Sequence, residues 1–486
     1  MRIKRILSGV LAFSVIVSAL SGCDESKKEN NYGLNPNVPV TITIWHYYNG
    51  VQQTGFDNMV KEFNDTVGIK KGIIVQAFSK GGVSELAGSV TAALNDEFGA
   101  EKPPDIFGCY ADNSYVVNQM GKLADISKYF TDEELAEYVD GYIAEGRYDE
   151  GTLKIFPTAK STEIMILNVT DWEPFAAAEG VTFDDLKTWE SLAEVAEKYY
   201  NYTDSLTPDV PNDGKAFFGR DAAENYLLIG AKQLGSPLVT DSDPIEPSID
   251  KATVKRLWES FYVPFVKGYY TAEGRFRSDD VKLGKVIALI CSTTGAAYYP
   301  DKVTRSDETE YPIENMLLPV PNFEGTEPYV VQQGAGMSVI KSDEKTEYAC
   351  TVFLKWFADT ERNMAFAAGS GYLPVKKAAN SAAELDNVIA NNGLSIGNTM
   401  YNTLVEAMEE VNGYNLYVAK PFDKSAEYRE ALKNYINNTC AEDSAEVKKM
   451  LERGADRAAA LEEYCSDTAF EKWFDGLEKA VQAAIN

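Results

Sequence analysis

The chain is poor in histidine, with 1 among 486 residues. A single histidine excludes the H-E-x-x-H zinc motif and any zinc site built from several imidazoles. His46 remains able to assist a serine or cysteine nucleophile, but no G-x-S-x-G elbow is present to hold such a serine. The stretch GAGMSV lacks the third glycine of a dinucleotide loop, and neither GKV nor GKA completes a P-loop. These absences leave no positive sign of an enzyme.

Positive charge is also scarce, with 46 Lys and Arg against 74 Asp and Glu and a formal net charge of −28. This balance excludes nucleic acid as a partner, because binding its phosphates requires Lys and Arg. It also repels anionic ligands unless a local cationic site overrides it. Paired carboxylates for glycoside hydrolysis stay open, since so many acidic residues offer many pairs. Such abundance is typical of a solvated surface.

Cysteine spacing argues against a disulfide framework or a cysteine metal site. The chain has 6 cysteines and no C-x-x-C, and setting aside Cys23 leaves an odd number. Cys440 and Cys465 either pair or stay as buried thiols, and we favour buried thiols. The loop at 203–214 carries Asp209 and Asp213, which suggests calcium, but proline and arginine occupy EF-hand ligand positions. We predict a plain surface loop and no metal.

The first apolar run is shorter than the ~20 residues that span a membrane. A basic start followed by the apolar run 6–20 indicates a signal peptide over residues 1–22. It ends in LSGC, which resembles the lipobox of bacterial lipoproteins and implies that Cys23 is lipidated. Residues 23–39 have the polar composition of a flexible tether. We expect an extracytoplasmic protein held at the membrane by a lipid anchor.

Beyond the tether, short apolar strands alternate with amphipathic helices. Strands are predicted at 40–45, 72–79 and 105–110, and helices at 56–64 and 83–96. This alternation indicates a mainly parallel sheet flanked by helices. Because ligands bind at the carboxyl ends of such strands, WHYYNG at 45–50 and YADNSY at 110–115 should share one rim.

A second α/β region follows, and the chain ends in helices. The helix TWESLAEVAEKYY at 188–200 precedes the apolar run KVIALICS at 285–292, and helical patterns dominate from residue 347 to the end. The pattern therefore predicts a second α/β unit with a helical C-terminal region.

Several stretches together resemble the extracellular solute-binding proteins of carbohydrate ABC importers. They are ITIWHYYNG, PPDIFGCYADN, GKLADISKYF, GTLKIFPTAKSTEIMILN, KTWESLAEVAEKY and the long segment from GAGMSVIKSDEKTEYA through GYLPVKKAA. The last stretch is the most specific, because it matches a glycine-rich strand, a helix ending F-L-K-W and G-Y-L-P in order. The matches extend over about residues 40–380.

The resemblance implies a two-lobed, periplasmic-binding-protein-like α/β fold of type II that closes over solute. We assign 40–160 plus 295–338 to lobe 1 and 161–294 plus 339–486 to lobe 2, with crossings near 160–163, 291–294 and 334–338. The family delivers its solute to ABC permease subunits and uses no cofactor, and we expect a monomer.

Within the family, the chain is most similar to the binders of glycerol-3-phosphate and glycerophosphodiesters. Matching motifs place ligand contacts at Ser161, Thr293, Thr294, Gly334 and Tyr372. Two departures concern charge. The acidic residue after DIFGCY is displaced to Asp112, and Glu427 stands where the group has a phosphate-binding arginine, with Arg429 two residues later. A buried phosphate without a bidentate partner is poorly compensated, so we favour a neutral saccharide.

Each candidate also has a structural reading. Trp45 either lines the cleft or packs in the core, Asp112 either binds or caps a helix, and Tyr372 either binds or packs at a helix end. Ser161 and Thr294 either contact ligand or bond to hinge backbone, and Arg220 with Asp221 either binds or forms a surface ion pair. His46 is expected as cleft wall or as a structural hydrogen-bonding group. The complete candidate set is Trp45, His46, Tyr48, Tyr110, Asp112, Ser161, Arg220, Thr293, Thr294, Gly334 and Tyr372.

The sequence therefore predicts a lipid-anchored receptor that binds a neutral sugar or oligosaccharide. A receptor for glycerol-3-phosphate or glycerophosphodiesters is the first alternative. A surface carbohydrate-active enzyme is the second.

Overall fold

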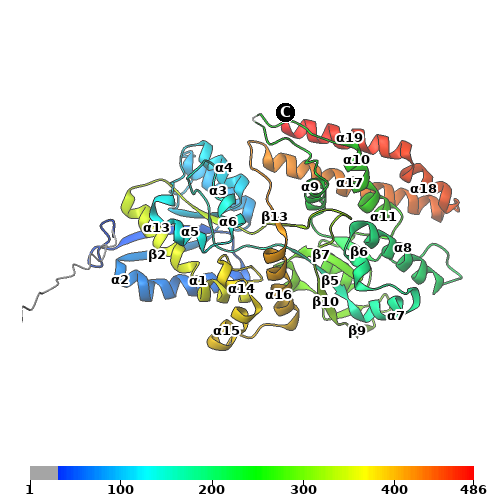
Figure 1. Ribbon diagram of the computed structural model, residues 1–486, viewed down its shortest axis with the longest axis horizontal. Coiled ribbons are helices and arrows are strands. Elements are labelled where there is room, and N and C mark those ends of the chain that lie inside the picture. The colour runs from blue at the N-terminus through cyan, green and yellow to red at the C-terminus, as the bar shows by residue number, and fades with distance from the viewer. Residues whose placement is uncertain (1–30, 243) are drawn as a thin grey trace, which may run out of the picture.

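The computed structural model describes residues 31–242 and 244–486, arranged as two lobes side by side (Figure 1). The sheet of the first lobe has the strand order β2-β1-β3-β12-β4. Its three parallel strands pair through β1, and β12 runs antiparallel to both β3 and β4. The bounds are β1 Val40–His46, β2 Ile73–Ser79, β3 Ile106–Cys109, β4 Phe156–Pro157 and β12 Gly336–Val339.

Helices cover the first sheet because each presents one apolar stripe. In α1 the buried residues are Phe56, Val60 and Phe63, at the spacing of one helical face. The Phe56 and Phe63 rings meet Phe353 and Phe357 of α13 in edge-on aromatic contacts. The helices of this lobe are α1 Gly50–Phe63, α2 Ile69–Lys71, α3 Val83–Leu94, α4 Ala111–Gln119, α5 Asp132–Ala136, α6 Asp140–Glu145, α13 Glu344–Phe357, α14 Thr360–Ser370 and α15 Ala382–Asn392.

The second lobe is built on a sheet of order β10-β5-β7-β6, and here the prediction of a mainly parallel sheet is wrong. β5 is antiparallel to both β7 and β10, and only β6 and β7 are parallel. The reason is that β5 carries the chain away from the first lobe, whereas β7 and β10 run back toward it. The bounds are β5 Glu163–Asn168, β6 Phe218–Arg220, β7 Ala288–Ser292 and β10 Asn315–Leu318.

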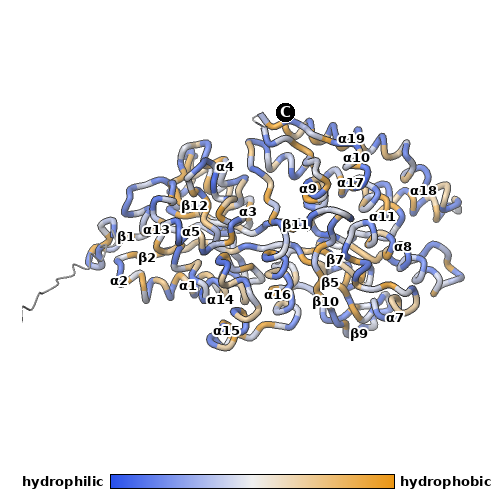
Figure 2. The backbone as a smooth tube through the Cα atoms, viewed as in Figure 1, coloured by the Kyte–Doolittle hydropathy of each residue, from blue (hydrophilic) through white to orange (hydrophobic). Residues whose placement is uncertain are grey.

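Helices and a small hairpin surround this sheet. Figure 2 shows hydrophobic residues along β5, β7 and β10, while the outer helices alternate between hydrophobic and hydrophilic residues. The surrounding elements are α7 Val169–Glu179, α8 Trp189–Ser205, α9 Ala223–Gln233, α10 Lys251–Leu257, α11 Val263–Val266, α12 Arg277–Lys282, β8 Lys302–Thr304, β9 Glu310–Pro312, α17 Ser425–Glu452, α18 Arg457–Cys465 and α19 Asp467–Ile485. Helix α17 packs on α9, α11 and α19, so the predicted helical C-terminal region is confirmed.

Within the described part of the chain, three segments connect the lobes: residues 158–162, the stretch 319–335 that holds β11 (Tyr329–Val331), and residues 414–424 that hold β13 (Asn415–Tyr417). β11 and β13 pair in parallel. Helix α16 (Asn398–Gly413) lies between the lobes and contacts β5, β10 and α14.

Two predicted lobe assignments and one predicted crossing therefore need correction. Residues 302–318 were expected in lobe 1, but β10 pairs with β5, and Val303 and Leu317 pack with Ile164. Residues 344–411 were expected in lobe 2, but their apolar side chains join the core of lobe 1. Residues 291–294 do not cross and end β7 at the edge of the second lobe. An amphipathic pattern shows that a segment covers a core, but it does not show which core.

The structure describes only part of the segment for which a signal peptide and a tether are predicted. The signal peptide and Cys23 lie outside the described residues. In the described part of the predicted tether, Leu34 is buried in the core of lobe 1 and the Tyr32 ring packs against Tyr129 and Tyr348. Residues 31–39 are thus a docked segment and not a free tether, because these two apolar side chains have a surface to cover.

The remaining structural predictions concern metal, thiols and membrane spans. Across residues 31–242 and 244–486, no group of His, Cys, Asp or Glu is arranged to hold a metal ion. Cys440 and Cys465 are free thiols, as are the three other described cysteines. No helix within the described ranges is long and apolar enough to span a membrane.

Candidate ligand-binding cleft

A cleft between the lobes contains two adjoining chambers, of about 880 and 410 Å³. We call them the larger and the smaller chamber. Both are lined by Ser292, Thr294, Gln333 and Tyr372, so they meet at these four side chains. Their volumes fall within the range of roughly 300–1,000 Å³ that is usual for small-molecule sites.

The larger chamber is walled mainly by the second lobe. Its lining combines the carboxylates of Glu163 and Asp221 with aromatic residues at Phe276, Tyr298 and Tyr299. Gln52 and Tyr372 close it from the first lobe. Burial raises the pKa of the Glu163 and Asp221 carboxyls above their ordinary values. The chamber therefore offers hydrogen-bonding oxygens beside apolar rings.

The smaller chamber lies between α4 of the first lobe and α17 of the second. Tyr110, Asp112 and Glu145 line it from one side, and Tyr417 and Arg429 from the other. Glu145 is held in place because its carboxylate pairs with the buried Lys160 and accepts a hydrogen bond from Gln332 Nε2 at 2.8 Å. Lys160 and Gln332 belong to two of the crossing segments. A wall of this chamber is thus tied directly to the connection between the lobes.

Tyr372 stands at the junction of the two chambers and is supported from behind. It follows Gly371, whose φ of +76° ends α14 in the left-handed conformation that glycine tolerates. The ring stacks on Phe366 with centroids 6.2 Å apart and planes 8° apart, and its hydroxyl lies 3.5 Å from the Tyr47 hydroxyl. Burial raises the pKa of Tyr372, so the hydroxyl stays protonated and is able to donate.

Five predicted site residues line the chambers, and six do not. Tyr110, Asp112, Ser161, Thr294 and Tyr372 line one or both. Trp45, His46, Tyr48, Arg220, Thr293 and Gly334 are packed around the cleft without lining either chamber.

Trp45 and Tyr48 belong to the core of lobe 1 and not to its cleft wall. Tyr48 is buried against Phe56, Phe366 and Tyr372, where it supports the Tyr372 ring. The Trp45 ring is covered by the Lys80 ammonium at 4.1 Å from its centroid. The alternation of side chains between the two faces of a strand does not show which of the aromatic residues at 45–48 will be covered by other elements.

His46 is a structural hydrogen-bonding group. Its Nδ1 accepts a hydrogen bond from the backbone N–H of Tyr48 at 3.2 Å, and its ring packs edge-on against Phe56. Burial lowers its pKa from the ordinary 6.5 to about 4. The imidazole is therefore neutral at pH 7, with its proton on Nε2.

This assignment predicts how the only histidine titrates. Its single set of imidazole ring signals in the proton NMR spectrum should move with a midpoint near pH 4. Between pH 6.5 and 4 the unfolded chain binds a proton that the folded chain does not bind. The free energy of unfolding should therefore fall with decreasing pH in this window, by up to about 1.4 kcal/mol per pH unit. His46→Gln should remove the contribution of this histidine to the slope, and a midpoint near 6.5 would contradict the assignment.

Gly334 and Thr293 shape the backbone beside the cleft. Gly334 has φ +79°, and a Cβ there would lie 2.5 Å from the carbonyl oxygen of Ala159. Only glycine allows the crossing segments to approach so closely. The backbone N–H of Thr293 donates to the carbonyl of Thr162 at 2.9 Å.

Arg220 forms a buried ion pair and not the surface pair with Asp221 that the sequence suggested. Its guanidinium binds Glu163, and both side chains are almost fully buried, at 1% and 3% exposure. Asn225 Nδ2 donates to the second Glu163 oxygen at 2.8 Å. Asp221 instead faces Arg277. Arg220 thus positions Glu163, which lines the larger chamber.

Arg429 lines the smaller chamber, and sequence reasoning missed it as a site residue. Its guanidinium donates to Asn225 Oδ1 at 2.6 Å and to Glu224 Oε1 at 3.1 Å. Glu427, at the position that the motif assigns to arginine, is exposed. Two residues along a helix turn the side chain by about 200°, so Glu427 and Arg429 face opposite ways. The helical periodicity of this segment could have shown that Arg429, and not Glu427, faces the chamber.

Two α/β lobes that are joined by crossing segments and that both line one cleft define the class of bilobed solute-binding proteins. The family model for bacterial extracellular solute-binding proteins matches residues 58–392, most of the chain, and the protein belongs to this family. The family predicted from the sequence motifs is thereby confirmed. This family is one of solute-binding proteins and not of enzymes, as the sequence predicted.

Solved structures show the same fold at low identity. The cyclic alpha-maltosyl-1,6-maltose binding protein of Arthrobacter globiformis is 18% identical, with a TM-score of 0.66 over 92% of this chain and 99% of that one. UgpB of Mycobacterium tuberculosis, solved with glycerophosphocholine, is 17% identical, with a TM-score of 0.60 over 85% and 99%. The GacH receptor of Streptomyces glaucescens, solved with acarbose, is 14% identical, with a TM-score of 0.59 over 86% and 100%. No curated protein matches the sequence.

Proposed function

We propose that this protein is the receptor of an ABC importer and captures a neutral sugar or oligosaccharide in the cleft between its lobes. The observation that carries the proposal is the chamber wall around Tyr372, where aromatic rings stand beside hydroxyl, amide and carboxylate groups from both lobes. Such walls suit sugars, whose apolar ring faces stack and whose hydroxyls both donate and accept hydrogen bonds. Of the proteins that are similar in fold, the Arthrobacter protein binds cyclic alpha-maltosyl-1,6-maltose and the Streptomyces receptor was solved with acarbose.

Charge supports a neutral ligand. The chain carries a formal net charge of −28. The chamber walls hold five acidic residues, Asp112, Glu145, Glu163, Asp221 and Asp279, and four basic ones, Arg275, Lys282, Lys420 and Arg429, so they have no excess of positive charge to attract an anion. Carboxylates accept hydrogen bonds from sugar hydroxyls and repel anions. Ligand should pass to permease subunits from a monomeric receptor.

Thermal unfolding with a panel of neutral sugars and glycerol phosphates tests the proposal. A matched ligand at a hundred times its dissociation constant should stabilise the fold by ~2.7 kcal/mol. The melting temperature should rise with at least one neutral sugar and stay unchanged with glycerol-3-phosphate. If only glycerol phosphates raised the melting temperature, the protein would instead be a receptor for glycerol-3-phosphate or glycerophosphodiesters.

That alternative, a receptor for glycerophosphodiesters, is favoured by one observation. Arg429 places a guanidinium at the smaller chamber, as a phosphate site requires, and the similar UgpB was solved with glycerophosphocholine. One nitrogen of the Arg429 guanidinium, Nη2, already donates hydrogen bonds to Glu224 and Asn225. Arg429→Gln separates the two functions, because it should abolish binding of a phosphodiester and leave a neutral sugar bound.

We further propose that Cys23 anchors the receptor through lipid, as LSGC implies. In cells that process lipoproteins, Cys23→Ala should abolish acylation and leave the signal peptide uncleaved at this step. Intact-mass spectrometry of the membrane fraction measures both changes. A variant that still gains acyl mass would exclude Cys23 as the anchor.

A further inference from the structure

Two large aromatic side chains are exposed at the larger chamber. Phe276 is 53% exposed and Tyr298 is 79% exposed, and both line this chamber from the second lobe. Burying a phenylalanine side chain is favourable by ~1.5–3 kcal/mol, so leaving it in water forgoes that stabilisation. The fold thus keeps two aromatic surfaces free inside the cleft.

The segment that presents Phe276 is held rigidly by buried charge. Arg277 is paired with Asp280, and both side chains are buried. Asp280 Oδ1 accepts a hydrogen bond from the Gly274 N–H at 2.8 Å, and Asp279 Oδ2 accepts one from the Phe276 N–H at 3.1 Å. The backbone on both sides of the exposed ring is therefore fixed.

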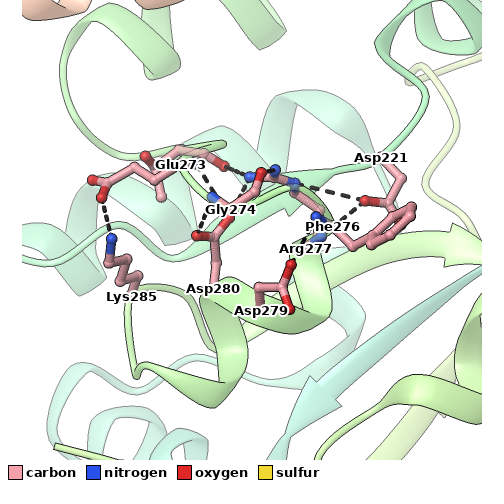
Figure 3. A network of polar contacts seen from close by, with 9 residues as sticks. Asp221, Glu273, Gly274, Phe276, Arg277, Asp279, Asp280 and Lys285 are labelled. Atoms are coloured by element: carbon pink, nitrogen blue, oxygen red, sulfur yellow. Dashed lines mark hydrogen bonds and ion pairs between the residues drawn. The ribbon is translucent and has the colours of Figure 1, made fainter.

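The same network reaches the chamber itself. The backbone N–H of Arg277 donates to Asp221 Oδ1 at 2.9 Å, and Asp221 lines the larger chamber. In Figure 3 the Phe276 side chain extends away from Lys285 and lies beside Asp221. The Arg275 guanidinium covers one side of the Phe276 ring, 5.3 Å from its centroid. Because the backbone that carries the ring is held in place, less entropy is lost when a ligand stacks on Phe276.

Size points to the kind of ligand that reaches these rings. The smaller chamber alone, at about 410 Å³, falls within the usual range for a small-molecule site. The larger chamber, at about 880 Å³, adds a second space that continues past Tyr372. A compact sugar held at the smaller chamber leaves Phe276 and Tyr298 without a partner, whereas a chain of sugar rings extends to them.

We propose that the larger chamber is an extended subsite, in which Phe276 and Tyr298 stack on the distal rings of an oligosaccharide longer than a disaccharide. This inference rests on the proposed function, and it adds ligand length and the two residues that select for it.

Calorimetry with oligosaccharide series of increasing length tests the subsite. The probes are maltose to maltohexaose, with the cellobiose and xylobiose series in parallel. Wild-type affinity should increase with length beyond the disaccharide. Phe276→Ala and Tyr298→Ala should each weaken binding of the longer members by about three- to tenfold, the usual range for one aromatic contact. Binding of the disaccharide should change less than about twofold.

Phe98→Ala is the matched control, because Phe98 is an exposed phenylalanine that lines neither chamber. It should leave affinity unchanged at every length. Since Phe276 and Tyr298 are exposed, their variants should melt near the wild-type temperature without ligand. Equal wild-type affinity at all lengths, or equal weakening of short and long sugars in the variants, would overturn the subsite while leaving the sugar receptor intact. Absence of any sugar binding by the wild type would remove the proposed function and the subsite with it.

Discussion

Replacing Tyr372 with alanine should weaken ligand binding by about thirtyfold or more. Tyr372 lines both chambers at their junction and is fixed there by stacking on Phe366. Truncating a well-packed aromatic residue at the centre of a binding site commonly costs ~2 kcal/mol or more. Calorimetry with the sugar that raises the melting temperature measures the loss. The effect should be the same for short and long ligands, in contrast to that at Phe276.

Tyr372→Phe separates the ring from its hydroxyl. This variant keeps the stacking surface and removes one hydrogen bond to the ligand. Its affinity should therefore fall by only about three- to tenfold, less than that of Tyr372→Ala. Both variants require melting curves without ligand, because Tyr372 is also packed against Tyr48. A folded Tyr372→Ala protein with wild-type affinity would show that the ligand does not use the junction.

Arg220→Ala should destabilise the protein by about 3–5 kcal/mol. This substitution leaves Glu163 buried without its cationic partner, and an uncompensated buried charge carries a cost of this size. Arg256→Ala is the matched control, since Arg256 pairs with Glu190 at 2.6 Å with both side chains partly exposed, at 42% and 30%. The free energy of unfolding of Arg256→Ala should fall by no more than about 1 kcal/mol. Urea unfolding of both variants measures the difference.

The pH dependence of Arg220→Ala identifies Glu163 as the cause. Burial already raises the pKa of Glu163, and loss of the guanidinium raises it further. The folded variant then binds a proton more readily than the unfolded chain, so its stability deficit should shrink as the pH falls. Adding Glu163→Gln should restore part of the loss at pH 7. If Arg220→Ala lost no more stability than Arg256→Ala, Glu163 would not need a cationic partner when it is buried.

Local patterns in the sequence predicted the elements that build the fold. The strands at 40–45, 72–79 and 105–110 appear within one residue of the predicted bounds. The helices predicted at 56–64 and 188–200 are also present but longer, at Gly50–Phe63 and Trp189–Ser205. Period-two and helical apolar patterns are enough here, because each element must bury one face. The motifs from PPDIFGCYADN to GYLPVKK likewise predicted the family.

The assignment of elements to lobes was decided by tertiary structure. The helices at 344–370 and the strand at 315–318 have clear apolar faces, yet each covers the core of the lobe that was not expected. An apolar face can be buried equally well against the core of lobe 1 or that of lobe 2. The choice depends on where the chain crosses, and the crossings depend on pairings such as that of β10 with β5.

The sequence by itself determined the class of fold and the absence of multi-histidine chemistry. It also predicted three of the residues that line the chambers from their place after a strand or in a family motif: Tyr110, Asp112 and Tyr372. Only the tertiary structure decided which side chains face the cleft: it buries His46 and Tyr48, turns Arg429 inward and leaves Phe276 exposed. The physical reason is that a cleft wall forms where two lobes meet. A residue lines it only if no neighbouring element covers the side chain, and the covering elements come from distant parts of the chain.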